Sequence, residues 1–341
     1  MKKYLLLALL PLTAMAAPSL KGFEKTYQDW DLICDNTGTC NMAGYQEERD
    51  GSEHPVSILF TRSAGEQAPV TAQLALSPED VGNKTAEIIL NGQSLGTIQN
   101  FSEEGNAKLS EKQTTELLTA LKGNASIEVV FGEFKEKVSD KGAAAAMLKM
   151  DEFQQRLNTP SALIRQGQEK HAVLAPQAAP QIEAVSVNNH KTIELKRGEK
   201  QFKHVLALLR KAYDGCVDED LESQDITLYP LTQNKVLVEA LCASGAYQST
   251  NYYAVLDDKL SKVEQVLADQ YNGVGGDRKQ GYAFVRGAYK GRGAGDCWSI
   301  QDAVWNGKIF ILTSEWTTGS CKRFPDGAWQ LPTFVSDIIV K

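Results

Sequence analysis

The chain has 341 residues, of which 23% are charged, and its formal net charge at pH 7 is -7. This length is enough for two domains, each with its own hydrophobic core. An acidic chain lacks the basic field that binds nucleic acid or anionic lipid, so neither is expected as the main partner.

The first residues predict export. Two lysines precede an apolar run over residues 4–12, and Ala14 and Ala16 stand in the A-x-A arrangement that signal peptidase recognises. We expect residues 1–16 to be a cleaved signal peptide, and loss of its two lysines takes the net charge from -7 to -9. The apolar run is shorter than the about 20 residues that span a bilayer, and no later segment predicts a membrane span. The expected location is the periplasm, or the exterior if the protein is secreted further.

The cysteines predict a disulfide framework. All six follow the signal, and an even count in an exported chain favours disulfides over free thiols. The count alone leaves the pairing open, but the cysteines fall into three separate local couples. We therefore expect the pairs Cys34 with Cys40, Cys216 with Cys242, and Cys297 with Cys321. Zinc is the alternative, but there is no C-x-x-C and the four histidines lie far from the cysteines in sequence. No metal is predicted.

The first domain is expected over residues 22–165. It opens with two strand-like runs in DWDLICDNTGTCNMAGYQEE, and continues with PVSILFTRS, PVTAQLALS and AEIILNGQSLG. Asn91-Gly92 is a strong signal for a two-residue hairpin turn. Ser110 and Gln113 have the spacing of a capping box before a leucine-rich helix that ends near Gly123.

A second helix is expected before the end of this domain. Ala143, Met147, Met150 and Phe153 follow one another at helical spacing, and Thr159-Pro160 marks the stop. The domain is thus predicted to combine an antiparallel sheet with one or two helices.

Residues 166–191 are rich in Ala, Pro and Gln and are the expected linker. The second domain, residues 192–341, begins with an amphipathic helix whose apolar stripe runs from Phe202 to Tyr213. The rest predicts a β-meander or open barrel, with Asn306-Gly307 as a second two-residue type I′ turn. The fold class expected for the whole chain is therefore α+β and β-rich, with each domain a sandwich or a meander plus one or two helices.

No catalytic or cofactor motif is present. The acidic loop CVDEDLESQD fails the EF-hand pattern, because Ser223 and Tyr229 stand where Gly and Glu are needed. The glycines of GVGGDRKQG and GRGAGD are followed by strand residues, whereas a phosphate-binding loop opens a helix. No cofactor is predicted, and the sequence favours a non-enzymatic protein while leaving an enzyme as an alternative.

The candidate functional surface is the stretch over residues 291–329, which holds four of the five tryptophans and two of the six cysteines. The candidate binding residues are Arg292, Asp296, Trp298, Trp316 and Arg323. Tryptophan and arginine are enriched at binding hot spots. The alternative is structural, because tryptophans on strands commonly pack in cores and an aspartate commonly caps a turn.

Several signatures in the chain resemble an exported Gram-negative family. GAGDC, WNG with the following FIL strand, the second cysteine with its basic neighbour, and GAWQLPTFV resemble the closing signature of domain-of-unknown-function family 1176 (DUF1176). DWDLICDN, Cys40 and Gly44-Tyr45 resemble its opening. The resemblance covers most of the mature chain. It implies export, but no mechanism, because the family has no established activity.

The first domain is also similar, more weakly, to the invasion-associated locus B family. The shared features are a Trp-x-x-x-Cys opening, a β-rich body and a late Ala-rich helix. This similarity implies an envelope or host-facing role. The chain departs from that family by adding the whole second domain.

The leading hypothesis is a non-enzymatic periplasmic binding or interaction protein, with an unknown protein or glycan partner in the envelope. The first alternative is a cell-wall or glycan hydrolase that uses the carboxylates of Asp296 and Glu315 beside sugar-stacking tryptophans. The second alternative is an inhibitor of a wall-degrading enzyme.

Overall fold

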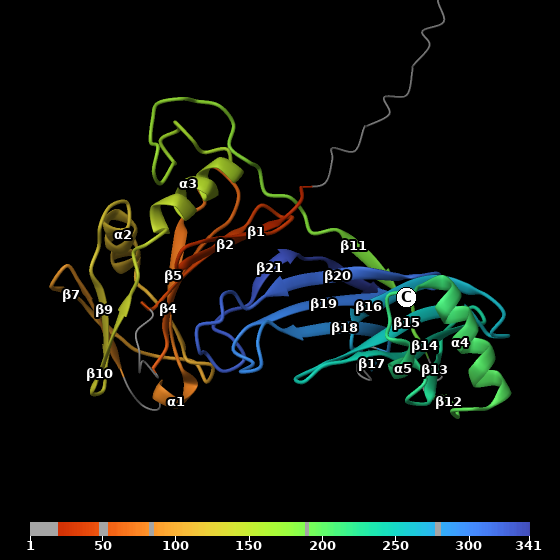
Figure 1. The fold of residues 1–341 in the computed structure, drawn as a ribbon. Helices are drawn as coiled ribbons and strands as arrows, with labels where there is room; N and C mark the ends of the chain where they lie inside the picture. Colours follow the sequence, from red (N-terminus) through yellow and green to blue (C-terminus); the bar gives the residue numbers. More distant parts are fainter. Residues whose placement is uncertain (1–19, 48–53, 82–84, 188–190, 277–280) are drawn as a thin grey trace, which may run out of the picture.

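The computed structural model describes residues 20–47, 54–81, 85–187, 191–276 and 281–341. The predicted signal peptide, residues 1–16, lies outside the described residues. Strands dominate and five short helices accompany them in the described part (Figure 1), so the predicted α+β, β-rich class is confirmed. No helix in this part combines the length and the apolarity that a bilayer span requires.

Two antiparallel sheets build the N-terminal part. The first sheet has the order β1 (Phe23–Tyr27), β2 (Trp30–Cys34), β3 (Cys40–Tyr45), β4 (Val56–Arg62), β5 (Val70–Leu76) and β8 (Asn106–Lys108). The second sheet has the order β10 (Phe134–Val138), β9 (Ile127–Phe131), β6 (Ala86–Leu90) and β7 (Gln93–Ile98). Leu32, Met42 and Phe60 of the first sheet share one core with Ile88 and Val129 of the second.

Three helices complete this part: α1 (Pro78–Val81), α2 (Glu111–Ala120) and α3 (Ala143–Phe153). The predicted capping box is confirmed. The Ser110 backbone N–H donates to Gln113 Oε1 at 2.8 Å, and the Gln113 N–H donates to Ser110 Oγ at 3.3 Å. The predicted hairpin at Asn91-Gly92 is also confirmed, since both residues have positive φ and Leu90 pairs with Gln93.

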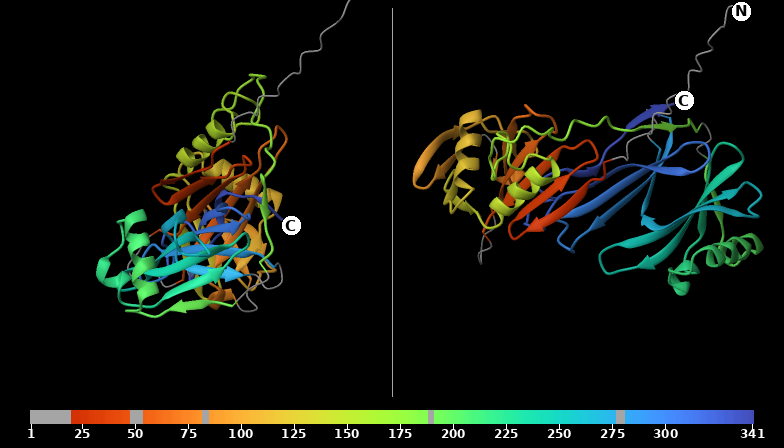
Figure 2. Two further views of the ribbon diagram at one scale, coloured as in Figure 1. Left: turned by 90° about the vertical axis from the view of Figure 1, so that its right-hand side faces the viewer. Right: turned by 90° about the horizontal axis from the view of Figure 1, so that it is seen from above.

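The chain then crosses to the C-terminal part along a segment without regular structure. Figure 2 shows this segment, residues 166–180, running from the N-terminal part toward β11 (Gln181–Ala184). It is hydrogen bonded to the N-terminal part. The Leu174 N–H donates to the Gln154 carbonyl at 2.9 Å, and the Leu174 carbonyl accepts from the Gly65 N–H at 2.8 Å. β11 then pairs in parallel with the last strand, β22 (Asp337–Val340).

Two antiparallel meanders form the C-terminal part. The third sheet has the order β12 (Ile193–Leu195), β13 (Ile226–Pro230), β14 (Lys235–Ser244), β15 (Ser249–Asp257) and β16 (Val263–Tyr271). The fourth sheet has the order β17 (Gly273–Gly276), β18 (Ala283–Lys290), β19 (Trp298–Trp305), β20 (Phe310–Thr317) and β21 (Leu331–Phe334). Leu237 and Tyr253 of the third sheet pack against Val285 and Trp305 of the fourth.

The helices α4 (Lys200–Ala212) and α5 (Asp218–Leu221) cover the other face of the third sheet. The predicted apolar stripe of α4 is buried there, with Phe202, Val205, Leu206 and Leu209 at most 4% exposed. This burial explains why the helix pattern was visible in the sequence.

One turn prediction is wrong. Asn306 and Gly307 do not form a two-residue type I′ turn, because Trp305 pairs with Phe310 and leaves a four-residue loop between β19 and β20. The Asn306 side-chain oxygen accepts hydrogen bonds at 2.9 Å from the N–H groups of Lys308 and Ile309. This side-chain turn competes successfully with the tight hairpin.

All three predicted disulfides are confirmed: Cys34 with Cys40, Cys216 with Cys242, and Cys297 with Cys321. The first closes the turn between β2 and β3, and the second ties the start of α5 to β14. The third joins the chain just before β19 to the chain just after β20. It therefore holds the segment that follows, residues 318–335, which we call the docking segment.

The docking segment packs on the outer face of the first sheet. Phe324, Trp329 and Leu331 form a second core with Ile33 and Tyr45 and their neighbours on that sheet. Both faces of β2 and β3 are consequently covered, which explains why every residue of these strands is buried.

Polar contacts fix the docking segment in one register. The Ser320 N–H and hydroxyl donate to the Asp31 carboxylate at 2.6 and 2.9 Å, and the Trp329 indole N–H donates to Ser57 Oγ at 2.7 Å. Lys322 Nζ lies 3.3 Å from an Asp29 oxygen. The N-terminal and C-terminal parts are thus joined by a packed, hydrogen-bonded contact as well as by the connecting segment.

Candidate functional site

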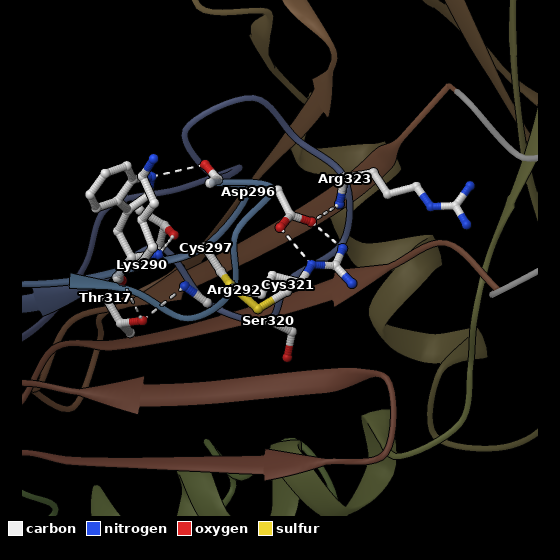
Figure 3. Close-up of a disulfide and its surroundings, with 12 residues drawn as sticks. Lys290, Arg292, Asp296, Cys297, Thr317, Ser320, Cys321 and Arg323 are labelled. Atoms are coloured by element: carbon white, nitrogen blue, oxygen red, sulfur yellow. Dashed lines mark hydrogen bonds and ion pairs between the residues drawn. A yellow bond between two sulfur atoms is a disulfide. The ribbon is translucent and has the colours of Figure 1, made fainter. Parts of the chain in front are cut away.

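The predicted binding residues, together with the other two tryptophans of residues 291–329, divide into three locations. The first is a buried carboxylate next to the third disulfide (Figure 3). Asp296 is 4% exposed. Its side chain accepts two hydrogen bonds from the Arg292 guanidinium, one of them at 2.7 Å, and a third from the Arg323 backbone N–H at 2.6 Å.

This cluster organises the turn around the disulfide. The hydrogen bond from Arg292 lowers the pKa of Asp296 below its usual value, and the Arg323 N–H lowers it further. Asp296 is therefore a carboxylate whose oxygens are used internally. Arg323 has φ of 68°, a conformation that non-glycine residues seldom adopt, and the contact of its N–H with Asp296 holds it there.

The second location is one face of the fourth sheet. Trp298 lies half-buried, with Lys290 Nζ 5.2 Å from its ring centroid, and its indole N–H donates to the Gly295 carbonyl at 2.9 Å. Ile300 follows two residues later on β19 and pairs with Trp316 on β20. Because paired residues share a face and faces alternate along a strand, Trp298 and Trp316 lie on the same side of the sheet.

The third location is the interior. Trp305 is fully buried between the third and fourth sheets, and its N–H donates to Thr232 Oγ1 at 2.8 Å. Trp329 is buried in the contact with the first sheet. These two tryptophans are packing residues, as the structural alternative anticipated.

A groove of about 380 Å³ lies where the two parts of the protein meet. Its walls come from the start of the N-terminal part and from β18, β19, β20 and β21. The lining residues are Gly22, Glu24, Tyr289, Ser299, Ile300, Gln301, Glu315, Trp316, Thr317 and Thr333. This volume is within the range of small-molecule sites.

Strand register identifies the side chains on the groove face of the fourth sheet. Tyr289 pairs with Ser299, and Gln301 pairs with Glu315. A Cβ placed on Gly287 would lie 3.1 Å from atoms of both the Tyr289 ring and the Gln301 side chain, which puts these two side chains on one face. The Gln301 amide donates to the Gln270 carbonyl of β16 at 2.7 Å, so this is the face that turns toward the third sheet.

Glu24 reaches the groove from β1, opposite the fourth sheet. Partial burial raises the pKa of Glu24 above its usual value, and the neighbouring carboxylates of Asp31 and Glu315 raise it further. The ten lining residues include two carboxylates and no lysine or arginine. The groove in the described part of the chain is therefore acidic.

The structure does not bring the suspected acid-base couple together. Glu315 pairs with Gln301, which is five residues beyond Asp296 in the chain. Five residues of extended chain span roughly 16 Å at about 3.3 Å per residue. This separation between Asp296 and the position of Glu315 is larger than that of the two carboxylates in a glycosidase. Asp296 is also engaged by Arg292 and by the N–H of Arg323.

The donor set next to Asp296 does not suit a metal ion. Among the described residues, Asp296, Cys297 and Cys321 are the one group with ligand atoms close enough together. Both sulfurs are in the disulfide, so neither is a thiolate, the form in which cysteine binds metal.

Sequence reasoning missed Glu24, Tyr289 and Gln301. Glu24 stands in a short strand-like run with no motif around it, and almost the whole chain separates it from Glu315. The one signal available was the alternation along β18 and β19. It assigns faces within a strand, but it does not show which other sheet lies opposite.

The fold and groove define a β-rich protein of two parts, cross-linked by three disulfides, with a groove where the parts meet. The chain belongs to the family described as "Protein of unknown function (DUF1176)", which matches residues 24–336. The predicted family resemblance is therefore confirmed, while the weaker similarity to the invasion-associated locus B family stays a prediction.

The chain is similar over nearly its full length to "Uncharacterized protein YpfG" of Escherichia coli (strain K12). The two are 23% identical over 346 residues, which cover 94% of this chain and 95% of that protein. No solved structure matches the chain significantly.

Proposed function

We propose that this protein is an exported, non-enzymatic binding protein of the cell envelope whose ligand occupies the groove between its two parts. The observation that carries the proposal is the groove itself, with the side chains of Tyr289, Gln301 and Glu315 facing Glu24 from the other part. An aromatic ring beside a few convergent polar groups is typical of small-ligand sites.

The rigidity of the groove supports this proposal. Its two walls belong to different parts of the chain, and the docking segment holds them together through the core around Trp329 and the hydrogen bonds to Asp31. A site held by such a contact loses little conformational freedom when a ligand binds, which favours affinity. The three disulfides and the predicted signal peptide support an extracytoplasmic location.

A groove-filling variant tests the proposal. Ser299 is exposed on the groove face of β19, so Ser299→Trp should fill the groove. Thr71→Trp is the matched control, because Thr71 is an exposed hydroxyl residue on a strand of the first sheet and does not line the groove.

The three proteins are compared by thermal shift against small molecules and oligosaccharides extracted from the envelope. We expect compounds that stabilise the wild type and Thr71→Trp but not Ser299→Trp. If every stabilising compound acts equally on Ser299→Trp, the groove is not the ligand site.

The surface with Trp316 and Arg323 remains a separate proposal for a protein or glycan partner. Trp316 borders the groove but shares a sheet face with Trp298, on the side opposite the Tyr289 side chain, and Arg323 has an exposed side chain beside the disulfide. Trp316→Ala and Arg323→Ala, each used as bait in envelope extract, should lose a partner that the wild type retains. Identical capture by all three proteins would count against this surface.

One observation favours a second candidate function, hydrolysis of a glycan. Glu24 and Glu315 flank the groove, and the pKa of Glu24 is raised, which suits a general acid. In this alternative Glu24 takes the place that the sequence suggested for Asp296. Turnover of peptidoglycan or model glycosides that Glu24→Gln abolishes would establish the hydrolase and displace the binding function.

The inhibitor hypothesis would be tested by mixing the protein with lysozyme and measuring the loss of lysozyme activity.

A further inference from the structure

We infer that the ligand of the groove is a small aliphatic di- or polyamine, bound in its protonated form between Glu24 and Glu315 with its methylene chain along Tyr289. This inference rests on the proposed function, since it names the chemical class of the ligand for the same groove.

The first step is the charge of the groove. Glu24 and Glu315 contribute two carboxylates, and the lining contains no cationic side chain. Asp31 lies close enough behind Glu24 to influence its titration. Both side chains are exposed, and two negative charges on facing walls of one groove attract a positive ligand more strongly than either charge alone.

Three other carboxylates, Asp296, Asp29 and Asp302, have cationic partners, which the two carboxylates of the groove lack in the described part of the chain. Asp296 is held by Arg292, Asp29 lies 3.3 Å from Lys322, and Asp302 receives two hydrogen bonds from Arg286 at 2.7 and 2.9 Å. Within the described part of the chain, neither Glu24 nor Glu315 forms such a salt bridge. Asp31, behind Glu24, is held by hydrogen bonds from Ser320 and Thr26 instead. In the described part of the chain, Glu24 and Glu315 thus differ from these carboxylates in having no cationic side chain beside them.

The second step is the shape and chemistry of the lining between the carboxylates. The Tyr289 ring offers an apolar face to methylene groups and a negative π face to an ammonium group. Ser299 supplies a hydroxyl oxygen and the Gln301 amide supplies a carbonyl oxygen, both of which accept hydrogen bonds from N–H donors. Two carboxylates on opposite walls match a ligand with positive charge at both ends.

The same arrangement disfavours two other ligand classes. A Ca²⁺ ion takes six to eight oxygen ligands within one small shell, whereas the two carboxylates here come from opposite walls. A neutral sugar would stack on Tyr289, but it would leave the charges on Glu24 and Glu315 unbalanced.

The experiment is a calorimetric titration of the purified, untagged protein with spermidine at pH 7.5 and low salt. Glu315→Gln and Glu24→Gln should each weaken binding at least tenfold, while their thermal unfolding stays close to that of the wild type. The matched control is Glu133→Gln, which removes the same charge from an exposed turn of the second sheet and should bind like the wild type. Raising the salt concentration should also weaken binding.

Proton exchange gives a second readout. Because the raised pKa of Glu24 falls when a cation binds beside its carboxylate, binding near that pKa should release protons in the wild type and fewer in Glu24→Gln. This change follows the ligand charge and would not accompany a merely structural role for Glu24.

Three outcomes would overturn the inference, and they separate it from the proposed function. If a neutral oligosaccharide binds, is blocked by Ser299→Trp and is insensitive to Glu315→Gln, the groove is a binding site but not for amines. If Ca²⁺ binds in a Glu315-dependent manner and spermidine does not, the ligand is a metal ion. If none of these ligands shows any dependence on the groove variants, both the amine inference and the proposed function fail.

Discussion

The docking contact and the groove lie side by side between the same two parts of the chain, yet the carboxylates of the contact have donors or a cation beside them and those of the groove do not. In the contact, Asp31 accepts two hydrogen bonds from Ser320 and Asp29 lies next to Lys322. In the groove, the pKa of Glu24 is raised by burial and by neighbouring carboxylates rather than lowered by donors. The negative charges of the contact are therefore compensated by neighbouring groups, whereas those of the groove are not.

This difference indicates which residues hold the structure together and which are available for a ligand. A carboxylate with its donors in place stabilises the fold, and its removal leaves those donors unpaired. A carboxylate kept partly desolvated beside like charges costs stability, so its presence needs another explanation, for which function is the usual candidate. The predictions below test this division, beginning with the contact.

Removal of the Trp329 side chain should have the largest effect. Trp329 is 7% exposed, packs against the first sheet and donates to Ser57 Oγ. Trp329→Ala should lower the free energy of unfolding by about 3–5 kcal/mol, measured by urea denaturation. Trp329→Phe keeps most of the packing and loses the hydrogen bond, and should cost about 1 kcal/mol. An equal loss of stability for Trp298→Ala, at a half-buried tryptophan outside the contact, would contradict the special role of the contact.

The third disulfide should come next. In the chain-entropy model, replacing Cys297 and Cys321 by alanine removes about 3.5 kcal/mol, against about 2.4 kcal/mol for Cys34 and Cys40, whose loop is shorter. Thermal unfolding of the two double variants measures both. The Cys297 and Cys321 variant should also expose the docking segment to limited proteolysis, whereas the other should not. Unchanged protease resistance would show that the docking segment holds its position without the bridge.

The Asp296 cluster should contribute a smaller amount that depends on pH. Asp296→Asn removes the charge that Arg292 binds, and should cost about 1–3 kcal/mol at pH 7. The pKa of Asp296 is lower in the folded state than its usual 3.8, so the stabilisation is complete above that value and disappears as pH falls through the folded pKa. Wild type and variant should therefore converge in acid. A constant difference down to the lowest pH would mean that the charge is not responsible.

Substitution of Glu24 should have the smallest effect on stability, and the sign should be opposite to that of the Asp296 substitution. Its folded pKa lies above the usual 4.5, so the native state binds more protons than the unfolded state between 4.5 and the raised value. Stability of the wild type then falls as pH rises through that window. Glu24→Gln should be as stable as the wild type or slightly more stable at pH 7, and the two should converge below pH 4.5. A marked loss of stability on substitution would place Glu24 with the structural carboxylates.

Local features of this fold were predictable because their signals lie close together in the chain. The disulfide pairs, the capping box at Ser110 and the hairpin at Asn91-Gly92 each depend on residues within one short segment. The turn at Asn306 was predicted wrongly, because an asparagine side chain can cap a longer loop as well as support a tight one.

The groove was not predictable for a different reason. Its two carboxylates lie near opposite ends of the chain and meet because the docking segment joins the fourth sheet to the first. The tryptophans gave a visible but mixed signal, since Trp305 and Trp329 are buried while Trp298 and Trp316 are partly exposed. The tryptophan-rich composition identified the region of the chain that borders the groove, but it did not show which side of the fourth sheet faces the groove.

The measurement that tests the central claim most directly is hydrogen exchange followed by mass spectrometry, with and without spermidine. If the ligand lies between the two parts, exchange should slow together in peptides that cover β1 and β20, and should not change in the hairpin of β9 and β10. Protection confined to one of the two parts, or found away from the groove, would contradict a shared site and the function proposed for it.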